Sequence, residues 1–263
     1  MDLIGYITVM LVGVTLAVIG GGGSILTVPI LVYLFKLPAD ISTSYSLLLV
    51  GLSAAVGAVQ YGRQGLIAYR IGAIFTVPAF LGVFSVRKFL MPQIPESFEL
   101  FSIFVTKDKL ILMVFACIML LASISMIRSR NGENNNEGKK KNLNIFVIAL
   151  EGLIVGGVTG FVGAGGGFLI IPALVLLAGL PMKQAVGTSL MIIAVKSIFG
   201  FTGDIGVLAI DWSFLGTISA ISIVGIFVGS HIAKFVKSET LKPLFGYFVL
   251  LMGGFIIFQQ LAG

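Results

Sequence analysis

Two glycine-rich runs, each followed by a proline, are the residues in this chain best suited to hold a small anion. They read GGGGSILTVP over residues 20–29 and GAGGGFLIIP over residues 163–172. Proline is tolerated best in a first helical turn, so helices are predicted to begin near Leu26 and Leu169. Their free N–H groups and positive dipole ends would face the glycines, as an anion site requires. The expected backbone contacts are Gly22, Gly23, Gly165, Gly166 and Gly167.

The glycine runs also interrupt the apolar sequence. The apolar segments that follow, 26–36 and 169–179, are too short to cross about 30 Å of hydrocarbon at about 1.5 Å per residue. Irregular backbone must then lie at membrane depth, where it is tolerated only inside protein or beside a wet cavity. Such paired, interrupted segments are typical of a transporter's substrate site. The alternative is that the glycines only let helices pack closely.

Hydroxyl side chains near the expected helix starts could donate hydrogen bonds to an oxyanion without fixing a charge in the membrane. The same hydroxyls could instead bond their own backbone or link neighbouring helices. The expected donors are Ser24, Ser44, Ser46, Thr188 and Ser189.

Lys196 lies midway along an apolar segment, 184–203. An ionisable residue at the centre of a membrane helix costs about 2.5 to 3.5 kcal/mol or more, which makes a function the default hypothesis. Its ammonium could balance the charge of a bound anion. The alternative is an ion pair with Glu151, which lies within the segment 144–162 and could also take part in coupling.

Three polar residues at segment ends are weaker candidates for coupling or gating. Gln60 and Arg63 end one apolar segment, and Asp204 ends another. Arg63 could draw anions toward the pathway, or could be an ordinary interfacial cation. Asp204 could bind a coupling proton or could cap its loop. Whether a proton or Na⁺ is coupled stays open.

The composition places these residues in a membrane. Hydrophobic residues make up 57% of the chain and charged residues only 11%, and the mean hydropathy is +1.10. A soluble domain carries about 25% charged residues. Apolar runs predict an all-α multi-pass protein of the cell (inner) membrane, with segments at 3–19, 26–36, 41–61, 69–90, 109–128, 144–162, 169–179, 184–203, 212–235 and 241–260.

Other function classes have little support in the composition. The net charge of +6 is spread between apolar runs rather than gathered on a basic face, which argues against nucleic-acid binding. The single cysteine, Cys117, and the single histidine, His231, form no disulfide or metal-ligand cluster. We therefore expect no metal and no cofactor.

The chain is an internal duplication with an offset of 143 residues. At this offset Pro29 matches Pro172, Gly13 matches Gly156, and further glycines and prolines coincide. Chance similarity of apolar runs explains matching leucines but not glycine and proline in register. Ser46 and Ser189 are also an equivalent pair.

Two domains follow from this duplication. The predicted repeats are 1–128 and 144–263, each with a Gly-broken helix pair and three further transmembrane helices. Between them lies a polar cytoplasmic linker, 129–143.

The charges of the connections favour inverted repeats. If each Gly-broken pair returns to its starting side, the acidic connection 204–211 faces outward and most basic connections face the cytoplasm. The connection between the segments 69–90 and 109–128, counted with its flanking residues, would then also be external. It carries Arg87, Lys88, Lys107 and Lys109, offset by Glu96, Glu99 and Asp108, which weakens the fit. If each pair instead forms one discontinuous span, the connection 204–211 would face the cytoplasm, which fits the rule less well.

The glycine runs, together with LPMKQAVGTSL at 180–190, resemble the TauE/SafE family of sulfite and organosulfonate exporters, and the likeness extends over both copies. The resemblance implies a duplicated carrier for sulfite or a similar sulfur-containing oxyanion. The first copy departs from the second, since STSYSLL at 42–48 stands where the second copy has VGTSL at 186–190. A homo-oligomer is compatible with this family.

Two rival functions have less support in the sequence. The segment GFTGD at 200–204 resembles only half of an intramembrane aspartyl protease signature, so an enzyme is not expected. An anion or ion channel remains the alternative to a carrier with alternating access, because glycine breaks and helix dipoles also build pores.

Overall fold

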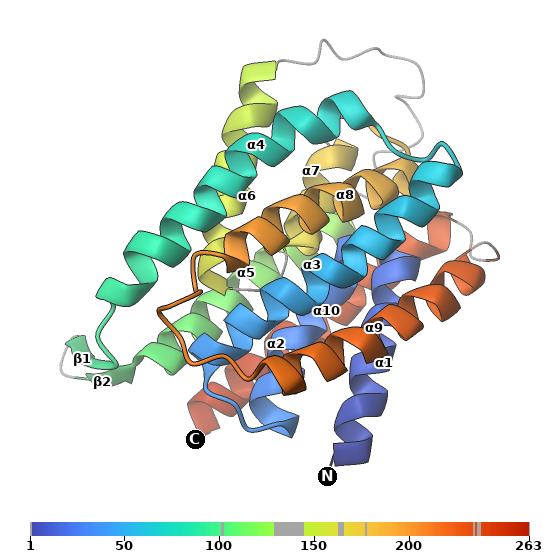
Figure 1. Cartoon of the computed structure of the whole chain (residues 1–263). Coiled ribbons are helices and arrows are strands. Elements are labelled where there is room, and N and C mark those ends of the chain that lie inside the picture. The colour runs from blue at the N-terminus through green and yellow to red at the C-terminus, as the bar shows by residue number, and fades with distance from the viewer. Residues whose placement is uncertain are drawn as a thin grey trace.

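The computed structural model describes residues 2–100, 103–128, 145–162, 166–176, 178–233, 235 and 238–262. The chain folds into a bundle of helices (Figure 1). The elements of the first half are α1 (Asp2–Ile19), η1 (Gly20–Leu26), α2 (Thr27–Pro29), η2 (Ile30–Leu34), α3 (Ala39–Arg63), α4 (Tyr69–Ser85), η3 (Val86–Leu90), η4 (Met91–Gln93), β1 (Ser97–Leu100), β2 (Ile103–Thr106) and α5 (Lys107–Arg128). Those of the second half are α6 (Ile145–Val162), α7 (Gly167–Leu176), α8 (Met182–Phe201), α9 (Trp212–Ala233) and α10 (Ser238–Ala262).

The predicted helical membrane fold is confirmed. Among the described residues, α3, α4 continued to Gln93, α6, α8 and α9 are long and apolar enough to cross a bilayer. Large apolar side chains such as Phe146, Phe227 and Phe258 are exposed, as expected where a helix faces lipid. The predicted linker 129–143 lies outside the described residues, and the domain boundaries stay a prediction.

Two details differ from the expectation. The first glycine run is not a loop, because residues 20–26 form a 3₁₀ helix and helical backbone therefore starts well before Leu26. Glycine adopts the positive φ of +72° at Gly20, which makes the sharp turn out of α1. A short antiparallel hairpin, β1–β2, also occupies the connection before α5. Its alternating apolar residues were too few to predict strands in an otherwise helical chain.

Each Gly-broken pair folds back on itself as a helical hairpin. In the first hairpin, Tyr6 near the start of α1 lies beside Phe35 just after η2, with ring centroids 5.8 Å apart. The second hairpin is α6 with α7, which are in contact. We call residues 20–23 the first tip, and Gly166 and Gly167, the described part of the second glycine run, the second tip.

The duplication is visible in the hydrogen bonds that end the short helices. The N–H of Leu37 donates to the carbonyl of Leu31 at 3.1 Å, and the N–H of Leu180 donates to that of Leu174 at 3.0 Å. Both bonds are of the kind that closes a helix C-terminus. Donors and acceptors each differ by 143 residues, so the repeat is structural as well as sequential.

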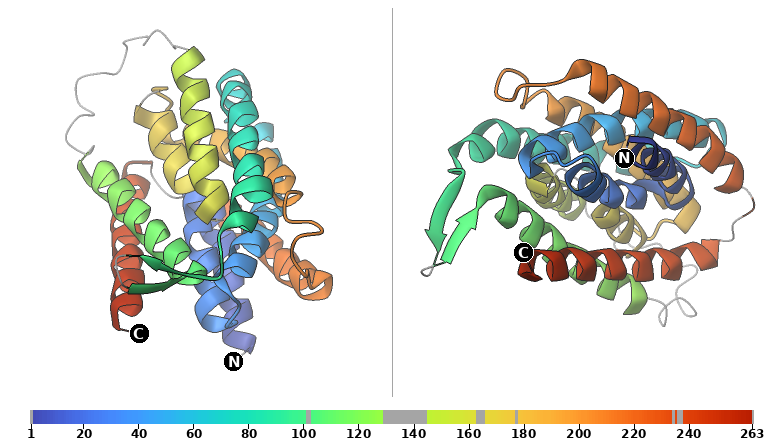
Figure 2. Two further views of the ribbon diagram at one scale, coloured as in Figure 1. Left: turned by 90° about the vertical axis from the view of Figure 1, so that its left-hand side faces the viewer. Right: turned by 90° about the horizontal axis from the view of Figure 1, so that it is seen from below.

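The two halves are interleaved, because each hairpin packs against the other half. Helix α1 packs on α9, and α6 packs on α4 (Figure 2). Glycines allow this close approach: a Cβ on Gly225 would collide with the Met10 carbonyl, and one on Gly82 would lie 2.5 Å from the Leu153 carbonyl. These two contacts are equivalent under the 143-residue offset.

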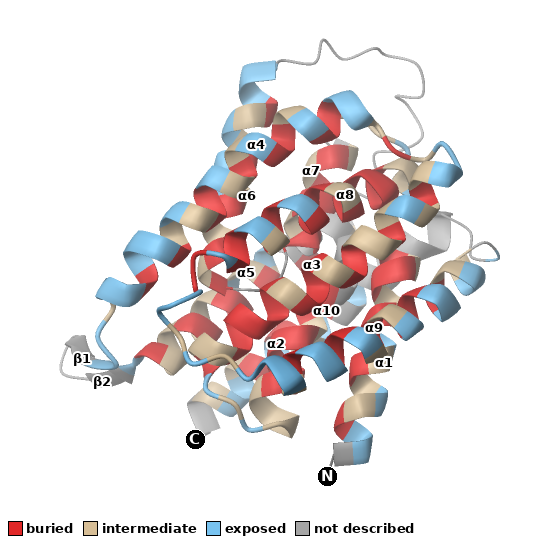
Figure 3. Ribbon diagram, in the orientation of Figure 1, coloured by how far each residue is buried: buried red, intermediate tan, exposed pale blue. Residues whose placement is uncertain are grey.

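The equivalent helices α3 and α8 cross at the centre, and each has more buried residues than any other helix among the described residues (Figure 3). A Cβ on Gly51 would lie 2.9 Å from Ile198, whereas one on Gly57 would lie 3.1 Å from Leu190. Because the contact moves backward along α8 as it moves forward along α3, the two helices run antiparallel.

Replacing Gly156 by Ala should destabilise the protein by about 1 to 3 kcal/mol, because the added methyl group would meet the Ala79 backbone. Gly254→Ala in α10 is the matched control, since nothing lies within 4 Å of a Cβ there. The control should be neutral or stabilising by up to about 1 kcal/mol, from helix propensity. Thermal unfolding of the purified protein in detergent measures both, and equal effects would contradict the packing argument.

Candidate functional site

One face of α8 meets both tips. Ser189 and Lys196 are seven residues apart, so they lie on the same side of the helix, about 10 Å apart along its axis. Ser189 lies against the first tip and Lys196 against the second. This face of α8 therefore joins the two halves' glycine runs, which the sequence predicted as one site.

Lys196 is fully buried, with 0% of its surface exposed. Its ammonium donates a hydrogen bond to the Thr159 hydroxyl near the end of α6 at 2.8 Å. A Cβ on Gly166 would lie 3.1 Å from the Lys196 Nζ, so the ammonium lies close to the backbone of the second tip. Gly166 also has a φ of +73°, which favours glycine. Two constraints thus require glycine beside the ammonium.

The first tip packs into the second half. A Cβ on Gly20 would lie 3.0 Å from Val186, 3.2 Å from Ile171 and 3.2 Å from the Ser189 hydroxyl oxygen. The η1 segment contacts both α7 and α8. The η1 segment, which includes Gly22 and Gly23, is therefore next to α7, which begins at Gly167. Gly165 lies outside the described residues.

The predicted hydroxyls are all buried, but they differ in their bonding. The Ser44 and Ser46 hydroxyls have no hydrogen-bond partner among the described residues. Ser189 donates to the Val186 carbonyl at 2.8 Å, and Ser24 lies within η1 and is fully buried. These hydroxyls remain predicted ligands.

The Thr188 hydroxyl stabilises the start of α4. Its hydroxyl accepts the Ala68 N–H at 2.9 Å, immediately before α4. The equivalent bond in the other half joins the Asp211 N–H to the Tyr45 hydroxyl at 2.6 Å, before α9. The pair shows that this hydroxyl position fixes a helix start in both halves.

Glu151 does not pair with Lys196. The ion pairs of up to 4.0 Å among the described residues include neither side chain, so this alternative is not realised. Glu151 is partly buried in α6, and Arg63 is exposed at the end of α3. Gln60 is partly buried, and its side-chain oxygen lacks a partner among the described residues. The structure brings none of these three to Lys196 by a hydrogen bond or ion pair.

Loop capping was the alternative to proton binding for Asp204, but its side chain does not cap the loop that follows α8. Its carboxylate pairs with Arg87 at 3.4 Å, and both side chains are almost completely buried. The following turn is held by the Asp204 backbone carbonyl, which accepts the N–H groups of Val207 and Leu208.

Sequence reasoning missed two residues. Arg87 was assigned to an external connection, although it lies inside the predicted segment 69–90 and could have been treated as an intramembrane cation like Lys196. Thr159 was missed as well; its signal was a hydroxyl in the last turn before the second glycine run.

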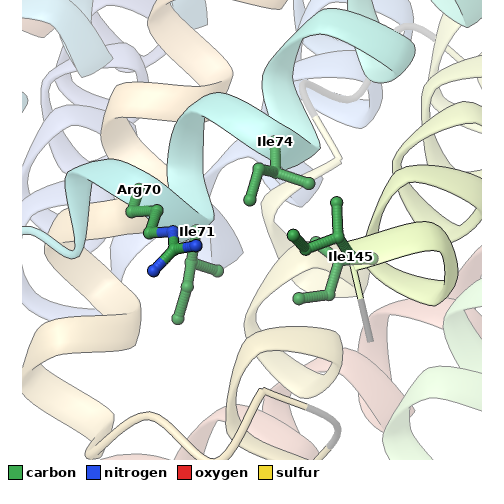
Figure 4. A pocket seen from close by; sticks show the side chains of 5 residues that line it. Arg70, Ile71, Ile74 and Ile145 are labelled. Atoms are coloured by element: carbon green, nitrogen blue, oxygen red, sulfur yellow. The ribbon is translucent and has the colours of Figure 1, made fainter. Parts of the chain in front are cut away.

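A cavity of about 170 Å³ lies between α4 and α6, away from the predicted residues (Figure 4). It is lined by Arg70, Ile71, Ile74, Ile145 and Ile148. Because Ile145 and Ile148 begin α6, about 25 Å of helix separates this cavity from the second tip. The buried hydroxyls and Lys196 are closed to solvent in this conformation.

Known proteins similar to this chain are membrane transporters by name. A "Probable membrane transporter protein" of Xylella fastidiosa (strain 9a5c) is 26% identical over 256 residues, covering 96% of this chain and 93% of that protein. The protein YdhB of Bacillus subtilis, which carries the same description, is 24% identical over 90% of this chain and 92% of its own length. MJ0441 of Methanocaldococcus jannaschii, also so described, is 36% identical over 40% of this chain and 41% of its own length.

No solved structure matches the chain at a significant level. The family profile "Sulfite exporter TauE/SafE" matches residues 6–256. With the duplicated helical fold and the match over nearly all of its length, this chain belongs to the TauE/SafE family and is a multi-pass membrane transporter.

Proposed function

We propose that the protein is a secondary carrier that moves a small sulfur-containing oxyanion, sulfite or an organosulfonate, by alternating access. The anion binds between the two tips, along the face of α8 that carries Ser189 and Lys196. The family supports the class of substrate, and the geometry supports the place where it binds.

The buried Lys196 ammonium carries this proposal. Its hydrogen-bond partner is a neutral hydroxyl, Thr159, and no carboxylate of the described residues lies within 4.0 Å of it. A buried cation is expensive unless an opposite charge compensates it. A bound anion at the second tip would supply that charge and would meet the glycine backbone at close range.

The hydroxyls give the anion neutral donors on the side of the first tip. Ser189 lies beside Gly20, and its present bond to the Val186 carbonyl is a local one that an oxyanion could replace. Ser46, its counterpart in the other half, is buried with a hydroxyl that has no partner among the described residues. A site with one cation and several hydroxyls suits an oxyanion of low charge.

Alternating access requires two equivalent conformations, and an inverted repeat provides them. The antiparallel contact of α3 with α8 supports inversion, because equivalent helices of parallel repeats would point the same way. The contact between Arg87 and Asp204 supports it too. This ion pair joins the connection after α4 to the connection after α8. In the inverted arrangement both connections lie on the same side of the membrane. In the arrangement with discontinuous spans they would lie on opposite sides and could not meet.

Coupling to a proton or Na⁺ remains a prediction. The residues predicted to take part in it are Glu151, Gln60, Arg63 and Asp204. The burial of the site indicates a closed conformation, so substrate must enter by movement of the hairpins against the other half.

Replacing Lys196 by Ala should lower sulfite transport in proteoliposomes by about 30-fold or more, the loss expected when one partner of a buried charge contact is removed. Lys183→Ala is the matched control, because Lys183 is an exposed lysine in the first turn of the same helix. Size-exclusion chromatography checks that both variants fold. Normal transport by the folded Lys196 variant would remove this residue from the site.

A carrier and a channel differ in how flux responds to substrate on the far side. Sulfite uptake by the wild-type protein should saturate, and sulfite preloaded inside the vesicles should accelerate entry of labelled sulfite. Both follow from a site that faces one side at a time. Flux that rises linearly with concentration, with no acceleration by preloading, would favour the channel.

A further inference from the structure

A second group of buried charges lies where α4 ends and α5 begins, at the left of Figure 1. Arg87, in the helical turn η3, is 1% exposed, and Asp204, in the turn after α8, is 3% exposed. Asp204 is eight residues beyond Lys196, which corresponds to about 12 Å along the direction of α8. The group therefore lies between the central site and one end of the bundle.

The guanidinium of Arg87 is only partly bonded. One nitrogen, Nη1, donates to the Asp204 carboxylate at 3.4 Å, longer than the roughly 2.7 to 2.9 Å of a strong charge-assisted bond. The other two nitrogens, Nε and Nη2, are buried and have no partner among the described residues. These two carry the parallel N–H groups that bind two oxygens of a carboxylate or oxyanion at once.

A cavity of about 30 Å³ adjoins this group, and we call it the Arg87 pocket. Its lining includes the charged residues Arg87, Lys107, Asp40 and Asp204 and the apolar residues Met91 and Leu208. A cavity of this volume can hold a water molecule. A larger guest requires that one of the lining carboxylates move away.

The charges of the Arg87 pocket are loosely paired. The ammonium of Lys107 is 3.9 Å from Asp40 and 3.5 Å from Glu96, and the Glu96 side chain is 84% exposed. Two cations thus face the pocket with long contacts to carboxylates. An incoming oxyanion can compete with those carboxylates for the same donors.

The fold does not need this ion pair. The positions equivalent to Arg87 and Asp204 in the duplicated halves are Ser230 and Tyr61. Tyr61 starts a similar backbone turn, since its carbonyl accepts the N–H of Gln64, which is equivalent to the bond from Val207 to Asp204. The backbone turn therefore forms without the charged pair, and the pair is specific to one end of the molecule.

We propose that the Arg87 pocket is a second binding site for the transported oxyanion, at one mouth of the pathway. The anion takes the Arg87 Nε and Nη2 donors with help from Lys107. Because the cavity is only large enough for a water molecule, the anion displaces the Asp204 carboxylate to make room. Displacement breaks a contact between the two halves, so occupation of the pocket favours opening at this end. The identity of the anion rests on the function proposed above.

The test measures sulfite binding by isothermal titration calorimetry, without oxygen, on the purified full-length protein. All proteins carry Lys196→Ala, so that the central site does not contribute. Asp204→Asn should bind sulfite about tenfold more tightly, because it removes a competing negative charge. Arg87→Gln should abolish binding. Lys88→Gln, which removes an exposed neighbouring cation, should change nothing.

Arg87→Gln alone leaves Asp204 buried without its partner and could fail to fold. The double variant Arg87→Gln with Asp204→Asn replaces the pair by two neutral amides, and it should fold without binding sulfite. Binding that is unchanged in this double variant, or an Asp204→Asn protein that binds no more tightly, would overturn the proposal. The two proposals can be separated. If transport does not depend on Lys196 but sulfite still binds in a way that depends on Arg87, the proposed central site is wrong and the proposed Arg87 pocket is supported.

Discussion

The structure depends on one constraint of the bilayer: a backbone that stops being helical in hydrocarbon must find its partners inside the protein. Each half of the chain turns sharply between its first two helical segments, and helix α8 lies against both tips. The first tip is covered by α7 and α8 of the second half, whereas the second tip lies against Thr159 and Lys196 of its own half. Without the second half, the first tip would lose this cover.

Glycine contacts hold the interleaved halves together. Hydrocarbon provides little hydrophobic force between helices, so association relies on close packing. The equivalent contacts of Gly225 with Met10 and Gly82 with Leu153 bring backbones together at two places related by the duplication. Side chains on these glycines would separate the hairpins from the opposite half and open the tips to lipid.

The backbone fold is duplicated, but the charged and polar side chains at equivalent positions differ. Lys196 and its partner Thr159 correspond to Ser53 and Leu16 in the first half. Ser53 donates to Ser222 at 2.8 Å and carries no charge. Because only the second copy carries this lysine, the buried ammonium lies beside the second tip and has no counterpart at the first. This asymmetry is compatible with the proposed carrier.

Much of this protein follows from the sequence by itself. Hydropathy predicted the membrane segments, since a bilayer of fixed thickness demands apolar runs of known length. Glycine and proline in register predicted the duplication, and an ionisable residue in an apolar segment identified Lys196. These features are local or periodic, so they can be predicted without knowing which helices touch.

Only the tertiary structure decided which side chains pair with one another. Lys196 pairs with Thr159 rather than Glu151, and Asp204 pairs with Arg87 across 117 residues of sequence. The 3₁₀ form of the first glycine run was also not predictable, because glycine permits several backbone conformations and the packing of Gly20 against Val186 and Ser189 selects among them. Contacts between residues far apart in the chain depend on how helices from both halves pack, and a single sequence does not encode that packing in any local pattern.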